Sequence, residues 1–324
     1  MFPTKVLDLD DLVKYVADKH GGFWSVCDPY IKSGNRIVAL PPCGACGCLT
    51  FRTSWIKEAG FEKVPGDLPG FLKLMQGLKK TGHPGGFALG HATGDANAWC
   101  HWVVWAHGGK MVDENDHVVI NSPETEAALN YAKEMYETFV PGVTAWNDVS
   151  NNKSFLAGEL SMTDNGISIY VSARKDKLPF ADDIDHAAYP VGPIGRPTES
   201  QGVWPMFVFK YAKFPNAAKA FIAYLLEKPQ FDAWLQDSAA YLTPCVKAYE
   251  HHPVFDEDPR RKPFGTAMER AVPISWAGTL GAQAAGVLAD WVMVDMVADA
   301  TAGGMAPKAA MEKAEKRARR FYKS

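Results

Sequence analysis

The sequence lacks the short motifs that mark many catalytic sites. It contains no Gly-x-Ser-x-Gly, no His-Glu-x-x-His and no phosphate-binding loop. It also has no apolar run of membrane-spanning length, because the stretch Leu280 to Val297 is interrupted by Gln283, Asp290 and Asp295. The sequence therefore gives little support to catalysis or to direct insertion into a membrane.

A strong charge of one sign is absent as well. The formal net charge is −3, which argues against nucleic acid as the main partner. Hydrophobic residues make up 47% and charged residues 22%, as in a globular chain with a substantial core. The 324 residues suit one large or two medium domains. Near the start, Lys5, Asp8 and Asp10 leave no apolar core of a signal peptide.

Cysteine is too sparse for a disulfide scaffold, with six in the whole chain. Three of them, Cys43, Cys46 and Cys48, form a short string whose thiolates could hold zinc or an iron–sulfur cluster. No second pair with matching spacing exists, and Cys100 with His101 is the only other candidate. We therefore expect no metal there and favour small core or cleft-lining residues over a metal-dependent hydrolase.

Hydrophobic periodicity, caps and glycine stops predict alternating helices and strands. Asp67 and Ser122 are each expected to cap a helix, and Asp95 and Asn97 can both cap the helix that runs to His107. Helices are expected over Leu7–His20, from Thr53 or Ser54 to Gly60, from Asp67 through Leu78, from Asp95 to His107, from Ser122 to Phe139, over Ala217–Leu226, Thr279–Ala298 and Pro307–Tyr322. Strands are expected over Arg36–Pro41, Gly85–Leu89, Leu160–Thr163, His186–Pro190 and Trp204–Phe209, with a hairpin over Lys110–Ile120.

The stretch Asn151 to Tyr170 is the most informative part of this pattern. A short helix ends at Gly158, a buried strand follows, and a new helix begins near Ile167. The first amides of that helix would be donors for a neutral polar ligand. An ordinary crossover in an α/β domain explains the same pattern, so both interpretations stay open at this point.

Several segments resemble the sugar-type solute-binding proteins of ABC importers, the maltose-binding-protein-like family 1. FLAGELSMTDNG, which begins at Phe155, resembles a signature of the second lobe of that family. Further matches occur in the same order as in the family: Leu49–Phe61, Gly94–Gly109, Asn121–Leu129 and Ala239–Pro244.

The resemblance implies an α/β, two-lobed periplasmic-binding-protein fold of type II. Lobe 1 would comprise residues 1–41 and 205–250, and lobe 2 would comprise 43–203 and 251–324. The implied function is capture of a small carbohydrate or polyol in the cleft between the lobes, with hinge closure and delivery to ABC permease subunits. The implied location is the periplasm, and no cofactor is expected.

The start of the chain departs from the family. The segment LDLDDLVKYVADKHGGFW resembles a region well inside a family member, so the opening of lobe 1 is expected to be missing. A processed chain, a mis-started gene, a natural fragment and a non-functional remnant are the alternatives. We expect weak solute binding or none, and exposed apolar faces at Leu12, Val16, Phe221 and Tyr224.

The resemblance also implies where a solute would bind. The family signature has an aromatic after its Asn-Gly, whereas this chain has Ser168, with Tyr170 two residues later. The ten tryptophans would supply flat faces for sugar rings, although core packing explains each of them individually. The expected ligand-binding residues are Asn97, Trp99, Asn165, Ser168, Tyr170, Trp204, Trp276 and Cys43, of which Asn97, Trp99, Asn165, Trp204 and Trp276 are expected to face a common cleft.

Overall fold

The structure is a computed structural model that describes residues 3–323, and the chain divides into two compact units. Unit 1 comprises Met1–Cys46 and Gln201–Pro273, and unit 2 comprises Gly47–Ser200 and Ile274–Ser324. Each unit is therefore assembled from two separate segments of the chain and has its own apolar core.

Residues 251–273 belong to unit 1, whereas the sequence analysis assigned them to lobe 2. The Thr243 hydroxyl donates a hydrogen bond to the Phe264 carbonyl (3.0 Å), and Met268 is buried in the core of unit 1. Charged residues and prolines interrupt the hydrophobic pattern of this segment. Its few apolar residues therefore did not predict that it packs in unit 1.

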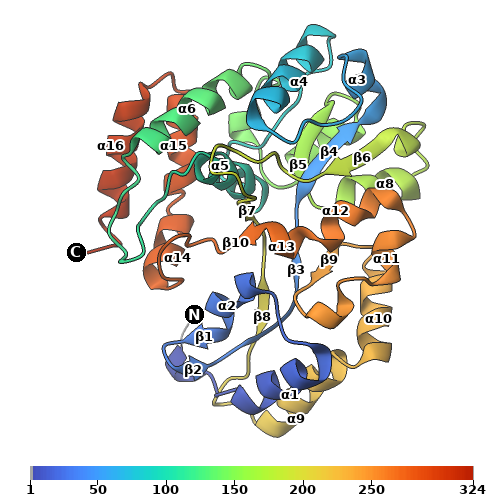
Figure 1. Ribbon diagram of the computed structural model, residues 1–324, viewed down its shortest axis with the longest axis vertical. Coiled ribbons are helices and arrows are strands. Elements are labelled where there is room, and N and C mark those ends of the chain that lie inside the picture. Colours follow the sequence, from blue (N-terminus) through green and yellow to red (C-terminus); the bar gives the residue numbers. More distant parts are fainter. Residues whose placement is uncertain (1–2, 324) are drawn as a thin grey trace. The chain divides into compact units, whose positions relative to one another are not determined.

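Unit 1 contains a three-stranded antiparallel sheet, in which β3 (Leu40–Ala45) lies between β8 (Trp204–Met206) and β9 (Leu242–Pro244) (Figure 1). Its middle strand carries Pro41 and Pro42, which have no N–H to donate, and the register with β8 shifts in this part of the strand. Gly44 lies so close to the chain at Gly202 that a Cβ would fall 1.8 Å from the Gly202 carbonyl oxygen. Glycine is therefore required at position 44, because a larger side chain would clash with the Gly202 carbonyl.

The elements of unit 1 are short. Its strands are β1 (Lys32–Ser33), β2 (Arg36–Ile37), β3 (Leu40–Ala45), β8 (Trp204–Met206), β9 (Leu242–Pro244) and β10 (Ala271–Val272). Its α-helices are α1 (Asp10–His20), α2 (Asp28–Ile31), α9 (Pro215–Leu225), α10 (Lys228–Asp237), α11 (Pro253–Asp256), α12 (Lys262–Gly265) and α13 (Ala267–Arg270). Its 3-10 turns are η1 (Pro3–Lys5), η2 (Ser25–Cys27), η5 (Lys247–Tyr249) and η6 (Pro259–Arg261).

Helix α1 confirms the amphipathic pattern predicted for it and ends at Gly21, whose φ of 75° is left-handed. Leu12 and Val16 are buried in the core of unit 1, so the expectation that they would be exposed is wrong. The expectation of exposure is confirmed for Phe221 and Tyr224, which are 59% and 53% exposed. The difference arises because α1 packs against α9 and Ile222 is the buried residue of α9, which leaves Phe221 and Tyr224 uncovered.

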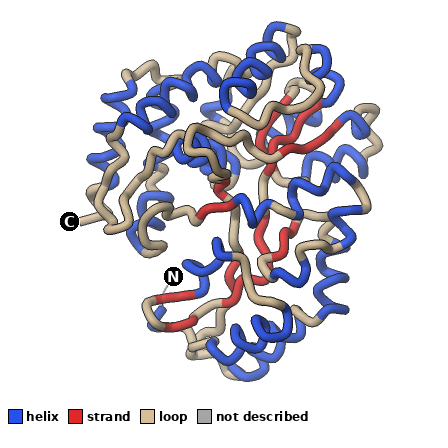
Figure 2. The backbone as a smooth tube through the Cα atoms, in the orientation of Figure 1, coloured by secondary structure: helices blue, strands red, loops and turns tan. Residues whose placement is uncertain are grey.

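Unit 2 contains the second three-stranded antiparallel sheet, with β4 (Cys48–Arg52) between β5 (Met162–Asn165) and β6 (Ile184–Ala187) (Figure 1). In the register of β4 with β5, Cys48 lies opposite Asn165 and Leu49 opposite Asp164. All four residues of β5 are buried, which places its polar side chains inside the unit. Figure 2 shows that strands occupy far less of the chain than helices and loops.

Helices and loops cover the sheet of unit 2. Its strands are β4 (Cys48–Arg52), β5 (Met162–Asn165), β6 (Ile184–Ala187) and β7 (Glu199–Ser200). Its α-helices are α3 (Thr53–Glu58), α4 (Leu68–Lys80), α5 (Asp95–Ala106), α6 (Pro123–Tyr136), α7 (Ser150–Leu156), α8 (Ser168–Lys175), α14 (Ala282–Ala289), α15 (Val292–Ala300) and α16 (Pro307–Ala318). Its 3-10 turns are η3 (Val143–Ala145) and η4 (Ala181–Asp183).

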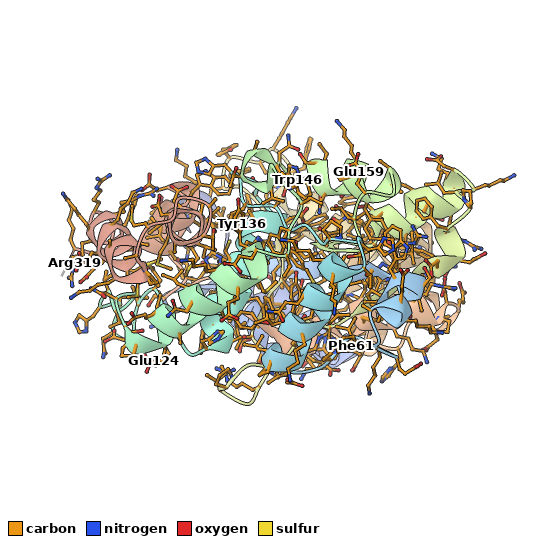
Figure 3. The ribbon with its side chains drawn as sticks, turned by 90° about the horizontal axis from the view of Figure 1, so that it is seen from above. Phe61, Glu124, Tyr136, Trp146, Glu159 and Arg319 are labelled. Carbon is orange, nitrogen blue, oxygen red and sulfur yellow. The ribbon has the colours of Figure 1, made fainter. Side chains whose placement is uncertain are left out.

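Two helices of unit 2 begin at the caps that the sequence predicts. The Asp67 carboxylate accepts from Gly70 N–H (2.8 Å) at α4, and the Ser122 hydroxyl accepts from Thr125 N–H (3.2 Å) at α6. In Figure 3, Glu124 and Tyr136 lie near the two ends of α6. Local chemistry is therefore sufficient to start these helices.

Two predicted elements differ in the structure. The long helix expected over Thr279–Ala298 is two helices, α14 and α15, separated at Trp291 in a left-handed conformation (φ 54°). The expected strand over Gly85–Leu89 makes a single bridge, from Gly85 to Phe139. Within residues 3–323, no helix is long and apolar enough to cross a membrane.

Candidate functional site

A cluster of neutral hydrogen-bonding groups lies at the end of β5 in unit 2. The Asn165 side-chain amide donates to the Asn152 side-chain carbonyl (2.7 Å) and to the Ser168 hydroxyl (3.3 Å). The Asn152 amide also donates to the Ser168 hydroxyl (3.1 Å). Asn152 and Ser168 are partly exposed, so this Asn152–Asn165–Ser168 cluster presents amide and hydroxyl groups at the surface of the unit. Such groups suit the hydroxyls of a neutral solute.

The position of the cluster follows from the local sequence. Gly158 ends the segment after α7 with a φ of 79°, β5 then runs to Asn165, and α8 begins at Ser168. The predicted helix–strand–helix order of this stretch is therefore confirmed. Sequence reasoning missed Asn152, because a polar residue in a short helix resembles an ordinary exposed position.

Two carboxyl groups lie beside the cluster, of which that of Asp164 is buried and that of Asp95 is partly buried. The Asn151 side-chain amide donates to the Asp95 carboxylate (2.7 Å) and to the Asp164 backbone carbonyl (2.9 Å). The Tyr189 hydroxyl donates to Asp164 Oδ2 (3.3 Å), while Asp164 Oδ1 has no partner among the described residues. The Asn151 amide therefore links the residues that carry the two carboxyl groups.

The environment of this Asp95–Asp164 pair favours protonation. Burial, reinforced by the Asp148 carboxylate, raises the pKa of Asp95 to about 7, against the opposing effect of the Asn151 hydrogen bond. Burial and the charge of Asp95 raise the pKa of Asp164 well above its ordinary range. The pair thus retains a proton near neutral pH, which limits negative charge next to the neutral cluster.

The start of α5 is capped from a distance rather than by its own side chains. Asp148 accepts from the N–H groups of Thr93 (2.9 Å), Gly94 (2.8 Å) and Asp95 (3.0 Å). The expectation that Asp95 and Asn97 would cap this helix is therefore wrong. The Asn97 side chain instead donates back to the Thr93 carbonyl (3.1 Å).

Trp99 and Tyr170 lie in the core rather than at a surface. The Trp99 indole N–H donates to the Ala88 carbonyl (2.6 Å), and its ring contacts Phe87 edge-on. Tyr170 is buried and packs edge-on against His186 (5.7 Å between centroids). Neither ring offers a face to a solute in this structure.

Trp276 is partly exposed in unit 2 and borders a small pocket. The Lys110 ammonium and the Arg196 guanidinium lie over its ring, at 5.4 Å and 5.1 Å from the centroid. The Trp276 ring also meets Trp105 edge-on (5.9 Å between centroids). The pocket lining includes His101, Trp105, Ser275, Trp276 and Tyr322.

Two residues that line this pocket, Trp105 and Ser275, have buried polar groups. The Trp105 indole N–H and the Ser275 hydroxyl are buried without a hydrogen-bond partner among the described residues. Burial lowers the pKa of His101 to about 4, so its ring, whose Nδ1 donates to the Asn97 carbonyl (2.8 Å), is neutral. The pocket therefore combines aromatic faces with uncharged hydrogen-bonding groups.

Among the expected ligand-binding residues of unit 1, Trp204 has an exposed side chain. Its ring is 47% exposed and lies near that of Tyr241 (6.4 Å between centroids). Cys43, opposite Trp204 in the β3–β8 register, is fully buried. Burial raises the pKa of the Cys43 thiol to about 12, so this cysteine is a protonated core residue.

The structure brings together Asn165 and Ser168 in one cluster, and it places Trp204 and Trp276 at the surfaces of units 1 and 2. The cysteine string divides, because Cys43 and Cys46 belong to unit 1 and Cys48 to unit 2. Within residues 3–323, no group of three or more His, Cys, Asp or Glu side chains is arranged to hold a metal ion.

Comparison with known families gives one match across most of the chain. Residues 4–263 match the family model described as "bacterial extracellular solute-binding protein". A curated relative from Deinococcus radiodurans, named "probable ABC transporter-binding protein", is 27% identical over 203 residues, which cover 59% of this chain and 48% of the relative. The chain thus spans about half the length of that relative.

Solved structures give a similar result at low sequence identity. Maltose-bound MalE3 of T. maritima has a TM-score of 0.82 and 21% identity over 99% of this chain and 81% of the other. A sugar transporter from Arthrobacter chlorophenolicus A6 with bound laminaribiose has a TM-score of 0.80 and 17% identity, with coverages of 99% and 82%. A solute-binding protein from Thermotoga lettingae TMO bound to α-D-tagatose has a TM-score of 0.78 and 16% identity, with coverages of 98% and 81%.

Proposed function

We propose that this chain, which belongs to the bacterial extracellular solute-binding protein family, captures a small carbohydrate or polyol for an ABC importer. The fold is the type II periplasmic-binding-protein fold predicted from the sequence. The family is extracellular, so the chain would act in the periplasm or at the cell exterior. Its partners would be the solute and the permease subunits of the importer, as the name of the Deinococcus relative suggests.

The family match carries this proposal, and the chemistry of unit 2 supports it. The Asn152–Asn165–Ser168 cluster is neutral, partly exposed and able both to donate and to accept hydrogen bonds. These properties fit a hydroxyl-rich solute better than an ion. The partly exposed rings of Trp204 and Trp276 would supply the flat faces that sugar rings need.

Isothermal titration calorimetry against a panel of monosaccharides, disaccharides and polyols tests the proposal. At least one member of the panel should bind to the unmodified chain. Asn165→Ala or Ser168→Ala should then weaken that binding by about tenfold, the effect of about 1.4 kcal/mol from a lost hydrogen bond.

Asn130→Ala is the matched control, because Asn130 is an exposed residue of α6 outside the cluster. Its affinity should equal that of the unmodified chain. If no sugar or polyol binds, the proposed solute class is wrong. If one binds with equal affinity to all variants, the class stands and the proposed cluster is wrong.

A further inference from the structure

Four of the six cysteines gather in the core of unit 1. Cys27, Cys43, Cys46 and Cys245 are all buried members of that core, although they come from three distant parts of the sequence. Cys48, the last residue of the cysteine string, lies instead opposite Asn165 in unit 2. The fold thus creates a group of thiols that the spacing of the string alone does not predict.

Backbone contacts bring two of these cysteines side by side. Trp24 N–H donates to the Cys245 carbonyl (3.1 Å), and Cys27 N–H donates to the Trp24 carbonyl (2.9 Å). Phe23 and Val246 form an antiparallel bridge next to this contact. The turn η2 therefore places Cys27 next to the extended segment that contains Cys245. Hydrogen bonds fix the backbone of both segments.

The side chains of the pair are in contact as well. The Cys245 thiol is hydrogen-bonded with Cys27, and this bond, followed by burial, raises the pKa of Cys245 well above its usual value. Cys43 and Cys46 raise the pKa of Cys245 through electrostatics, whereas Cys27 also shares a side-chain hydrogen bond with it. Cys27 is thus the thiol placed to react with Cys245.

We propose that Cys27 and Cys245 form a disulfide bond in the exported protein. Their family is extracellular, and disulfides form and persist in such oxidising compartments. A bond forms between the two sulfur atoms as each thiol loses its proton, and the pair gives up two electrons. The oxidant is a protein or small-molecule disulfide, which is reduced to two thiols by exchange through a mixed disulfide.

Burial determines when this reaction takes place. Exchange requires an accessible thiolate, and both thiols are covered in the folded unit. The bond therefore forms during folding, before the core of unit 1 closes. Once formed, it joins the two chain segments of unit 1 and restricts the unfolded state.

Thiol mapping of the secreted protein is the direct test. The protein is unfolded without reductant, treated with iodoacetamide, and examined by intact mass and by peptide mapping. We expect four alkylated cysteines rather than six, a mass about 2 Da lower before alkylation, and one peptide pair linked through Cys27 and Cys245. Six alkylated cysteines, or a link that uses Cys43 or Cys46, would overturn the proposal.

Thermal unfolding with and without reductant gives a second readout. Reductant should lower the Tm of the unmodified protein by several degrees. It should have the same effect on Cys100→Ala, a matched control because Cys100 is buried in unit 2. Cys27→Ala should show no effect of reductant, and a reductant-dependent Tm in that variant would contradict the assignment. If Cys27→Ala does not fold, the peptide map of the unmodified chain still shows whether Cys27 and Cys245 are linked.

Discussion

At the scale of single residues, the Asp95–Asp164 pair makes the stability of the protein depend on pH. The pKa of Asp95 rises from 3.8 to about 7 on folding, mainly through burial. Between these pH values the folded state holds a proton that the unfolded state has released. The contribution of Asp95 to the free energy of unfolding therefore falls as pH rises from about 4 to about 7, by an amount on the order of 3 kcal/mol.

Asp95→Asn should remove much of this pH dependence. The substitution keeps an oxygen to accept the Asn151 hydrogen bond and removes the charge that burial and Asp148 disfavour. We expect the variant to be more stable than the unmodified chain at pH 8, by about 1–3 kcal/mol, and similar to it at pH 4.5. Urea unfolding between pH 4.5 and pH 8 measures how the free energy of unfolding of each protein depends on pH.

Asp176→Asn is the control for this experiment, since Asp176 is an exposed residue at the end of α8. Its stability should follow that of the unmodified chain at every pH. Parallel stability curves for Asp95→Asn and the unmodified chain would show that Asp95 ionises as it does in the unfolded state.

At the scale of the element, helix caps explain why local predictions succeed. Asp67 and Ser122 cap α4 and α6 as expected, because a capping bond involves only neighbouring residues. The cap of α5 was not predictable in this way. It comes from Asp148, more than fifty residues later in the chain, and only folding brings that carboxylate to the helix.

Asp67→Ala should destabilise unit 2 by about 1 kcal/mol, because Gly70 N–H loses its acceptor. Asp67→Asn keeps an acceptor oxygen and should cost much less. Chemical unfolding of the two variants measures the difference. Equal losses for both would indicate that the charge of Asp67, rather than its capping bond, stabilises α4.

At the scale of the whole molecule, unit 1 carries a run of exposed aromatic side chains. Phe207 and Phe209 pack edge-on (5.1 Å), and Phe209 and Tyr211 stack (4.7 Å). All are substantially exposed, and the exposed set continues along the chain: Phe207, Phe209, Tyr211, Phe214, Phe221 and Tyr224. Exposed apolar surface of this kind favours association.

We therefore predict that the chain of residues 1–324 associates as its concentration rises. Sedimentation velocity over a range of concentrations should reveal the association. The double substitution Phe214→Ser and Phe221→Ser should reduce it, whereas Tyr241→Ser, at an exposed aromatic outside the run, should not. A chain that stays monomeric at all concentrations would contradict this prediction.

The resemblance of several segments to a known family implied the solute-binding fold, and the sequence by itself determined most helices and the helix–strand–helix order around Asn165. These features depend on neighbouring residues or on a periodic pattern, both of which are visible in one dimension. Tertiary structure alone decided that Trp99 and Tyr170 are core residues, that Asp148 caps α5 and that Cys27 lies beside Cys245. Burial and contacts between distant residues depend on how the elements pack, and the order of residues in the chain does not specify that packing locally.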